Sequence, residues 1–202
     1  VSPDAFLQLV FQLAAYRCFG KQIATYEATQ TRQFIHGRTE TAPTVSVDSK
    51  AFVEAMGLKY MADRDDILAK KEKLKLLRQA AAYHHNYTLD ACGGMGVDRH
   101  FLGLSLVRKD GEQPPDLFKE PIFERSKTWR LSTSGLPTTP GFGPVVEDGL
   151  GVGYGLHSNS CLFHISSRKE NKYVDRFCHE LVLALKEMKG LLEADDDEIT
   201  AQ

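Results

Sequence analysis

The sequence predicts an α/β fold in which helices flank a mixed sheet. Two observations predict it: apolar residues recur at helical spacing in several segments, and short runs separated by glycine and proline follow Pro114-Pro115. The 202 residues, 42% hydrophobic and 26% charged, suit one globular domain or one lobe of a larger protein. We expect one lobe over residues 1–194 and an acidic, frayed tail over 195–202.

The first predicted helix begins almost at residue 1. Ser2-Pro3-Asp4 combines an N-cap, a proline in the first turn and an acid at the positive end of the helix dipole, and Gly20 ends the helix. We expect no targeting peptide within these residues, and we interpret the chain as a fragment. Residues 22–39 are polar with several aromatics and are expected to be ordered. Asp48 or Ser49 is predicted to cap a short helix that Gly57 ends.

The remaining elements follow from periodicity. Residues 65–90 form the longest predicted helix, and a glycine-rich turn follows it. Asp98 is predicted to cap a further helix that continues to Leu106. The last helix has an apolar face between Val174 and Leu192. Short strands are predicted at four places: 128–132, 143–146, 149–156 and 160–166.

Composition and motifs exclude several functions. The net charge is −2, which is atypical of a nucleic-acid-binding protein, and no apolar run reaches the roughly 18–20 residues of a membrane span. The four cysteines have no CxxC spacing and are expected to be free thiols. No metal-binding motif, dinucleotide fingerprint or phosphate loop occurs, so we expect no metal. The seven histidines show no triad signature, and a structural role is expected for each of them.

Arg99 is the most informative residue of the sequence. Asp98, Arg99 and His100 stand together at the head of an apolar run that ends at Leu106. An unpaired buried charge is expensive, so the guanidinium needs solvent, an internal partner or an anionic ligand. The planar guanidinium can donate two parallel hydrogen bonds to one carboxylate.

Two further segments carry candidate binding groups. The stretch 132–135 reads Ser-Thr-Ser-Gly at a predicted strand end, which places Ser132 and Ser134 on one face. Two such hydroxyls can donate to a substrate oxygen or an oxyanion, or they can satisfy the backbone at the strand end. Phe142 stands between two glycines, where it can face a ligand or belong to the core beside a tight turn.

An ordered set of motifs resembles the choline/carnitine acyltransferase family. It covers almost the whole chain and comprises Val1-Ser2-Pro3-Asp4-Ala5-Phe6, Ala24-Thr25-Tyr26-Glu27, Gly37-Arg38-Thr39-Glu40, Val97-Asp98-Arg99-His100, Leu131-Ser132-Thr133-Ser134 and Gly143-Pro144-Val145-Val146. The match is to the C-terminal part of the family. The resemblance implies one lobe of the chloramphenicol-acetyltransferase type, in an enzyme whose second, N-terminal lobe supplies the catalytic histidine.

The resemblance also implies roles for individual residues. Tyr26, Thr39 and Arg99 correspond to contacts of the carnitine carboxylate. Ser134 corresponds to the donor that stabilises the oxyanion, Ser132 to a hydroxyl that holds carnitine, and Phe142 to an aromatic near the trimethylammonium group. The CoA contacts that the resemblance implies are Ser2, Asp4 and Gly135.

The chain departs from the family pattern at several positions. Ala28 stands where the family usually has a serine, Gly135 stands where it usually has a glutamine, and residues 42–44 also differ. Short-chain members resemble this segment but carry bulky residues just before the Phe142 position, whereas residues 138–141 here are small. We therefore predict medium or long acyl chains.

The predicted function is that of the C-terminal part of a carnitine O-acyltransferase, an enzyme of fatty acid and lipid metabolism. It would transfer acyl groups reversibly between CoA and the carnitine hydroxyl, with acyl-CoA as co-substrate and no permanently bound cofactor. The chain alone is expected to be inactive, and a mitochondrial location is expected. A non-catalytic paralogue that keeps the fold is the alternative, and a choline acyltransferase is a weaker one because choline has no carboxylate for Arg99.

Overall fold

The computed structural model describes residues 1–58, 67–109, 111–136 and 141–200, and it forms two compact units. The first unit comprises Val1–Ile23, Thr44–His85 and Lys172–Gln202, and the second comprises Ala24–Pro43 and Asn86–Asn171. The sequence predicted one lobe over 1–194, and that assignment to a larger enzyme stays a prediction. Each unit is built from segments that are distant in the sequence.

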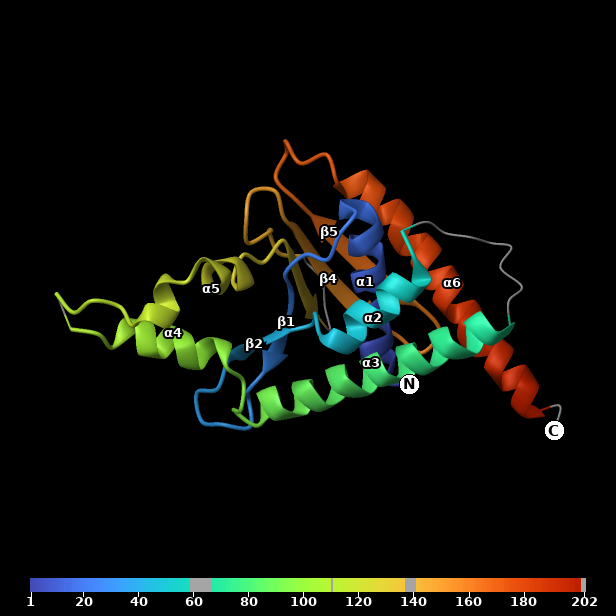
Figure 1. Cartoon of the computed structure of the whole chain (residues 1–202), viewed down its shortest axis with the longest axis horizontal. Coiled ribbons are helices and arrows are strands. Elements are labelled where there is room, and N and C mark those ends of the chain that lie inside the picture. The colour runs from blue at the N-terminus through green and yellow to red at the C-terminus, as the bar shows by residue number, and fades with distance from the viewer. Residues whose placement is uncertain (59–66, 110, 137–140, 201–202) are drawn as a thin grey trace. The chain divides into compact units, whose positions relative to one another are not determined.

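The first unit is helical. It contains α1 (Pro3–Phe19), α2 (Val47–Met56), α6 (Val174–Thr200) and most of α3 (Ile67–Cys92). In Figure 1, α1 (blue) lies beside α6 (red), and α1 also packs against α2. Almost every residue of α1 between Ala5 and Cys18 is buried, which agrees with its apolar sequence. The buried residues of α6 include Phe177, Leu181 and Met188.

The predicted ends of these helices are partly confirmed. Ser2 caps α1 by accepting from the Ala5 N–H at 3.5 Å, and Gly20 adopts the left-handed conformation that ends the helix, with φ of 70°. At α2 the prediction was wrong, because Ser46 is the N-cap and Asp48 and Ser49 lie in the first turn. Ser46 and Ser49 form a reciprocal capping box, which satisfies two backbone N–H groups at once.

The second unit contains a five-stranded mixed sheet in the order β2-β1-β3-β4-β5. The strands are β1 (Thr25–Gln30), β2 (Thr39–Pro43), β3 (Leu131–Gly135), β4 (Leu150–Leu156) and β5 (Cys161–Ser166). β1 and β3 are parallel, as are β3 and β4, whereas β2 and β5 are antiparallel to their neighbours. The predicted α/β fold with a mixed sheet is therefore confirmed.

The sequence located only part of this sheet correctly. β4 and β5 match the predicted strands to within one residue, but β1 and β2 lie in a region for which no strand was predicted. The predicted strand at 143–146 is wrong, because these residues have no strand pairing. Gly143 and Pro144 offer little to a ladder, since glycine weakens a strand and proline lacks the N–H.

Three short helices complete the second unit: α4 (Asp98–Leu106), the 3-10 helix η1 (Asp116–Lys119) and α5 (Pro121–Ser126). α4 packs against β2, and α5 packs against η1. Asp98 does not cap α4 as predicted, because Val97 holds the cap position and offers no side-chain hydrogen bond. The first N–H groups of α4 therefore need partners from elsewhere in the fold.

The end of the chain differs from the predicted tail. α6 continues to Thr200, so the helix includes most of the acidic stretch, and residues 201–202 lie outside the described residues. The division of the chain at residue 194 stays a prediction. Within the described residues, no helix has the length and apolarity that crossing a membrane would require.

Candidate active site on one sheet face and an adjacent pocket

One face of the sheet in the second unit collects several predicted site residues. One row of paired residues crosses four strands. Tyr26 on β1 pairs with Ser132 on β3. The row continues through Gly151 on β4 to Ser166 on β5. Neighbouring residues in register point to the same face of a sheet. Tyr26 and Ser132 therefore lie side by side on this face.

A second row on the same face lies two residues further along the strands. It runs from Ser134 on β3 through Gly153 on β4 to His164 on β5. The prediction that Ser132 and Ser134 share a face is confirmed by their spacing in β3. Ser132 is buried and Ser134 is half-buried, so the row with Ser134 is the more accessible of the two.

Alternate glycines in β4 allow the segment around Phe142 to approach this face closely. A Cβ on Gly151 would lie 2.6 Å from the Phe142 carbonyl oxygen, and a Cβ on Gly153 would lie 3.9 Å from Cε1 of the Phe142 ring. The Ser166 hydroxyl donates to the Phe142 carbonyl and so ties the segment to β5. Phe142 thus lies over the face that carries Ser132 and Ser134.

Two polar atoms on this face are buried without a hydrogen-bond partner in the described part of the chain. They are the hydroxyl oxygen of Ser132 and Nε2 of His164. A buried polar atom without a partner costs free energy, and such atoms are uncommon in folded proteins. A bound ligand that reaches this face could supply both partners.

His164 is the residue on this face that the sequence reasoning missed, because it was interpreted as an ordinary strand position. Its Cβ would lie 3.2 Å from a Cβ on Gly141, so the side chain is close to the segment that carries Phe142. The available signal was its position two residues before Ser166 in a strand beside the glycines of β4. Alternating glycines in a strand often mark close approach of a ligand or of another backbone segment.

Thr39 lies at the start of β2 and is exposed. It is paired with Gln30, whereas Tyr26 is paired with Pro43. Four strand positions separate the two rows, which corresponds to about 13 Å. The alternation along the hairpin places Thr39 and Tyr26 on the same face but at opposite ends of the pairing.

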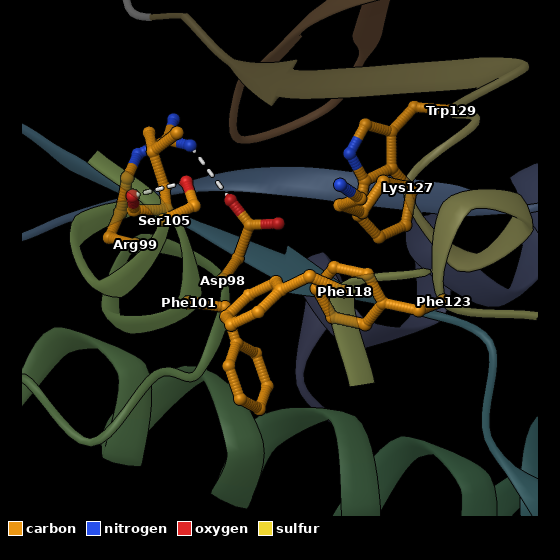
Figure 2. Close-up of a pocket in the computed structure, with 9 residues that line it drawn as sticks. Asp98, Arg99, Phe101, Ser105, Phe118, Phe123, Lys127 and Trp129 are labelled. Carbon is orange, nitrogen blue, oxygen red and sulfur yellow. Dashed lines mark hydrogen bonds and ion pairs between the residues drawn. The ribbon is translucent and has the colours of Figure 1, made fainter. Parts of the chain in front are cut away.

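Arg99 lines a pocket of about 210 Å³ formed by α4, η1, α5 and the residues that precede β3. Figure 2 shows the rings of Phe101, Phe118 and Phe123 grouped together, and the Lys127 ammonium lies over the Phe123 ring, 4.5 Å from its centroid. The phenylalanine rings meet edge to face, an arrangement that aromatic rings prefer. The pocket therefore combines aromatic walls with two cations.

The Arg99 side chain is 49% exposed and forms an ion pair with Asp98 at 2.8 Å. Of the three possibilities that the sequence left open, the structure realises two at once, solvent and an internal partner. A guanidinium has five N–H donors, and Asp98 occupies one nitrogen at most in this arrangement. The remaining donors are available to an anion that enters the pocket.

An aromatic contact links Arg99's pocket to the sheet face. The Trp129 ring lines the pocket and lies 5.3 Å from the Tyr26 ring, measured between ring centroids. Tyr26 therefore stands between the row of Ser132 and the pocket of Arg99. The structure brings Tyr26, Ser132, Ser134 and Phe142 to one face and connects them to Arg99 through Trp129.

The three predicted CoA contacts are divided between the units. In the first unit, Ser2 is engaged as the cap of α1, and the Asp4 carboxylate lies 3.7 Å from Nε2 of the buried His84. In the second unit, Gly135 ends β3, and a Cβ there would lie 3.6 Å from the Tyr154 ring. Each of these roles stays a prediction.

Two cysteines outside the sheet, one on α3 and one on α6, have raised pKa values. Burial, followed by the charge of Glu27, raises the pKa of the Cys92 thiol, and burial, followed by the charge of Asp175, raises the pKa of Cys178. Thiols with raised pKa values stay protonated near neutral pH and are poor nucleophiles. The face is suited to binding an ester, a thioester or an oxyanion through hydroxyls.

The chain is similar to known acyltransferases. The choline/carnitine O-acyltransferase family model matches residues 1–183. Carnitine O-acetyltransferase from Mus musculus is 39% identical over 201 residues, which cover 96% of this chain and 31% of that protein. The mitochondrial carnitine O-acetyltransferase from Saccharomyces cerevisiae is 36% identical over 203 residues, covering 97% of this chain and 29% of that protein.

Choline acyltransferases are also similar. Choline O-acetyltransferase from Danio rerio is 34% identical over 206 residues, which cover 98% of this chain and 31% of that protein. The chain thus spans about a third of the length of the curated relatives that it matches. On the match of the family model and on these identities, the chain belongs to the choline/carnitine O-acyltransferase family.

Proposed function

We propose that this chain forms the C-terminal part of a carnitine O-acyltransferase. The reaction is reversible transfer of an acyl group between the CoA thiol and the carnitine hydroxyl. The carnitine oxygen attacks the thioester carbonyl carbon, and the tetrahedral intermediate collapses with release of the CoA thiol. A histidine from a part of the enzyme outside this chain takes the hydroxyl proton and returns it to the sulfur.

The observation that carries the proposal is the paired hydroxyls of Ser132 and Ser134 on the face beneath Phe142. Ser134 donates to the oxyanion that develops on the former carbonyl oxygen, which is the point where charge accumulates in acyl transfer. The buried Ser132 hydroxyl, which has no partner in the described part of the chain, holds carnitine. The Phe142 ring offers its face to the trimethylammonium group.

Carnitine is favoured over choline by the cation at Arg99. Arg99 pairs with the carnitine carboxylate, and Tyr26 and Thr39 donate hydroxyl groups to it. A guanidinium binds a carboxylate strongly because both partners are charged and planar. Choline has no group that could use this cation.

Medium or long acyl chains are favoured by the small residue before Phe142. Even a Cβ at Gly141 would lie 3.2 Å from the Cβ of His164, so a bulky residue at this position would crowd the segment that carries Phe142. The other small residues of this segment, 138–140, lie outside the described residues. The relatives named above are acetyltransferases, so the proposed preference would distinguish the chain from them.

Acyl-CoA is the proposed co-substrate, and Ser2, Asp4 and Gly135 contribute to its contacts. We propose a mitochondrial location, supported by the mitochondrial carnitine O-acetyltransferase among the relatives. Fractionation of cells that express the tagged full-length protein tests this location.

Steady-state kinetics of the full-length protein that carries this segment tests the function. Carnitine and choline are compared as acceptors, with acetyl-, octanoyl- and palmitoyl-CoA as donors, and CoA release is measured with a thiol reagent. We expect turnover with carnitine, and a higher kcat/KM for octanoyl- or palmitoyl-CoA than for acetyl-CoA. Turnover of choline alone would reject the carnitine assignment, and no turnover of either acceptor would favour a non-catalytic paralogue.

A further inference from the structure

We infer that Glu40 is a positioning residue for Arg99. The inference deepens the proposed function and rests on Arg99 as a substrate contact. Glu40 lies on β2, an edge strand of the sheet, directly after Thr39. Glu40 is buried, with 6% relative exposure, although the Arg99 side chain on α4 is half-exposed.

The carboxylate of Glu40 holds the start of α4. Oε1 of Glu40 accepts the backbone N–H of Arg99 at 3.1 Å and the backbone N–H of Thr41 at 2.8 Å. A helix leaves its first N–H groups without intrahelical partners, and here the cap residue Val97 has no side-chain acceptor. Glu40, which is 59 residues from Arg99 in the sequence, therefore takes the place of the missing N-cap side chain.

The negative charge also favours this position. The N-terminus of a helix carries partial positive charge, which stabilises a carboxylate nearby. One side chain thus ties α4 to the strand that carries Thr39 and bonds the residue whose side chain enters the pocket. The backbone of Arg99 is located by Glu40, and the guanidinium is oriented by Asp98.

Gly96 provides an independent sign of this contact. A Cβ at position 96 would lie 2.6 Å from Cδ and 2.8 Å from Oε2 of Glu40. These separations are shorter than real Cβ contacts, so any larger residue at 96 must displace the carboxylate. Position 96 therefore requires glycine, because the Glu40 side chain lies so close to its backbone.

The role predicts a selective kinetic effect. A displacement of α4 moves Arg99 away from the acceptor site but leaves the acyl-CoA contacts on β3 in place. A displacement of about 1 Å in a positioning group can reduce activity by roughly 100-fold. We expect Glu40→Ala in the full-length protein to raise the carnitine KM about 10- to 100-fold, with the acyl-CoA KM within about twofold of the wild type.

Two further variants separate positioning from general stability. Glu40→Gln keeps an acceptor oxygen for the Arg99 N–H, so its carnitine KM should lie much closer to the wild type than that of Glu40→Ala. Gly96→Ala should reproduce the defect of Glu40→Ala, because the new methyl group displaces the carboxylate. Gly103→Ala, in the same helix, is the matched control, since a Cβ there meets no atom within 4 Å.

Amide hydrogen exchange of α4 provides a readout that does not depend on activity. The Arg99 N–H should exchange faster in Glu40→Ala and Gly96→Ala than in the wild type and in Gly103→Ala. Unchanged Arg99 exchange, or equal increases in the carnitine KM and the acyl-CoA KM, would overturn the inference. If the wild type has no carnitine-dependent turnover, the proposed function fails, and the positioning of Arg99 for carnitine fails with it. Exchange then reports only whether Glu40 holds α4.

Discussion

Replacement of Arg99 by glutamine tests the carnitine site most directly. The substitution removes the charge but keeps a polar side chain of similar length on α4. In the proposed complex the guanidinium donates to a carboxylate, and a hydrogen bond between charged groups contributes about 1.5–3 kcal/mol. Arg99 is half-exposed and is shared with Asp98, so the lower part of this range applies, about 1.5–2 kcal/mol.

That free energy corresponds to an increase of about 10- to 30-fold in the carnitine KM, because each 1.4 kcal/mol is a factor of ten. The KM for acyl-CoA should change little, since the thioester does not reach the carboxylate clamp. The assay is CoA release at varied carnitine and saturating acyl-CoA, and then the reverse arrangement.

Arg108→Gln is the matched control for this experiment. Arg108 is an exposed cation just beyond α4, and its side chain donates to the Ser105 and Glu112 carbonyls. The control should leave both KM values unchanged. An unchanged carnitine KM in Arg99→Gln would remove Arg99 from the site and, with it, the main argument for carnitine over choline.

Three further substitutions test other parts of the reasoning. Ser134→Ala should lower kcat about 100-fold with a small effect on both KM values, and an effect confined to KM would contradict the oxyanion role. Gly141→Leu should shift the preference from octanoyl- or palmitoyl-CoA toward acetyl-CoA, because even a Cβ there lies 3.2 Å from the Cβ of His164 and a larger side chain must crowd the segment that carries Phe142; the ratio of kcat/KM values measures this. Glu187→Ala should destabilise the first unit by about 3–5 kcal/mol, because it leaves the fully buried Arg17 guanidinium without its carboxylate partner at 2.7 Å. Arg17 also donates to the Gly57 and Met56 carbonyls. Urea unfolding measures the loss, and a change below about 1 kcal/mol would show that these carbonyls suffice.

The strands that the sequence did not reveal are those with polar interiors. In β1 the buried residues are Thr25, Glu27 and Thr29, and in β2 they include Glu40 and Thr41. A search for alternating apolar residues does not detect such strands, because their buried side chains hydrogen-bond instead of forming an apolar face. For example, the Tyr154 hydroxyl on β4 donates to Oε1 of Glu27 on β1 at 2.6 Å.

Helix boundaries show the same division between local and distant causes. Ser2 and Gly20 were predicted correctly because capping depends on residues within one turn. The cap of α4 was not predicted, because its acceptor is Glu40. No local rule relates a helix start to a carboxylate on a strand so far away in the sequence.

The sequence alone determined the α/β class, the hydroxyl pair at 132 and 134, and the motifs that resemble the family. Each of these depends on short-range spacing or on an ordered set of residues. Only the tertiary structure decided that Tyr26 is paired beside Ser132 and that Glu40 holds α4. Strand register and buried hydrogen bonds join residues about 60 to 110 positions apart, and no local pattern specifies them.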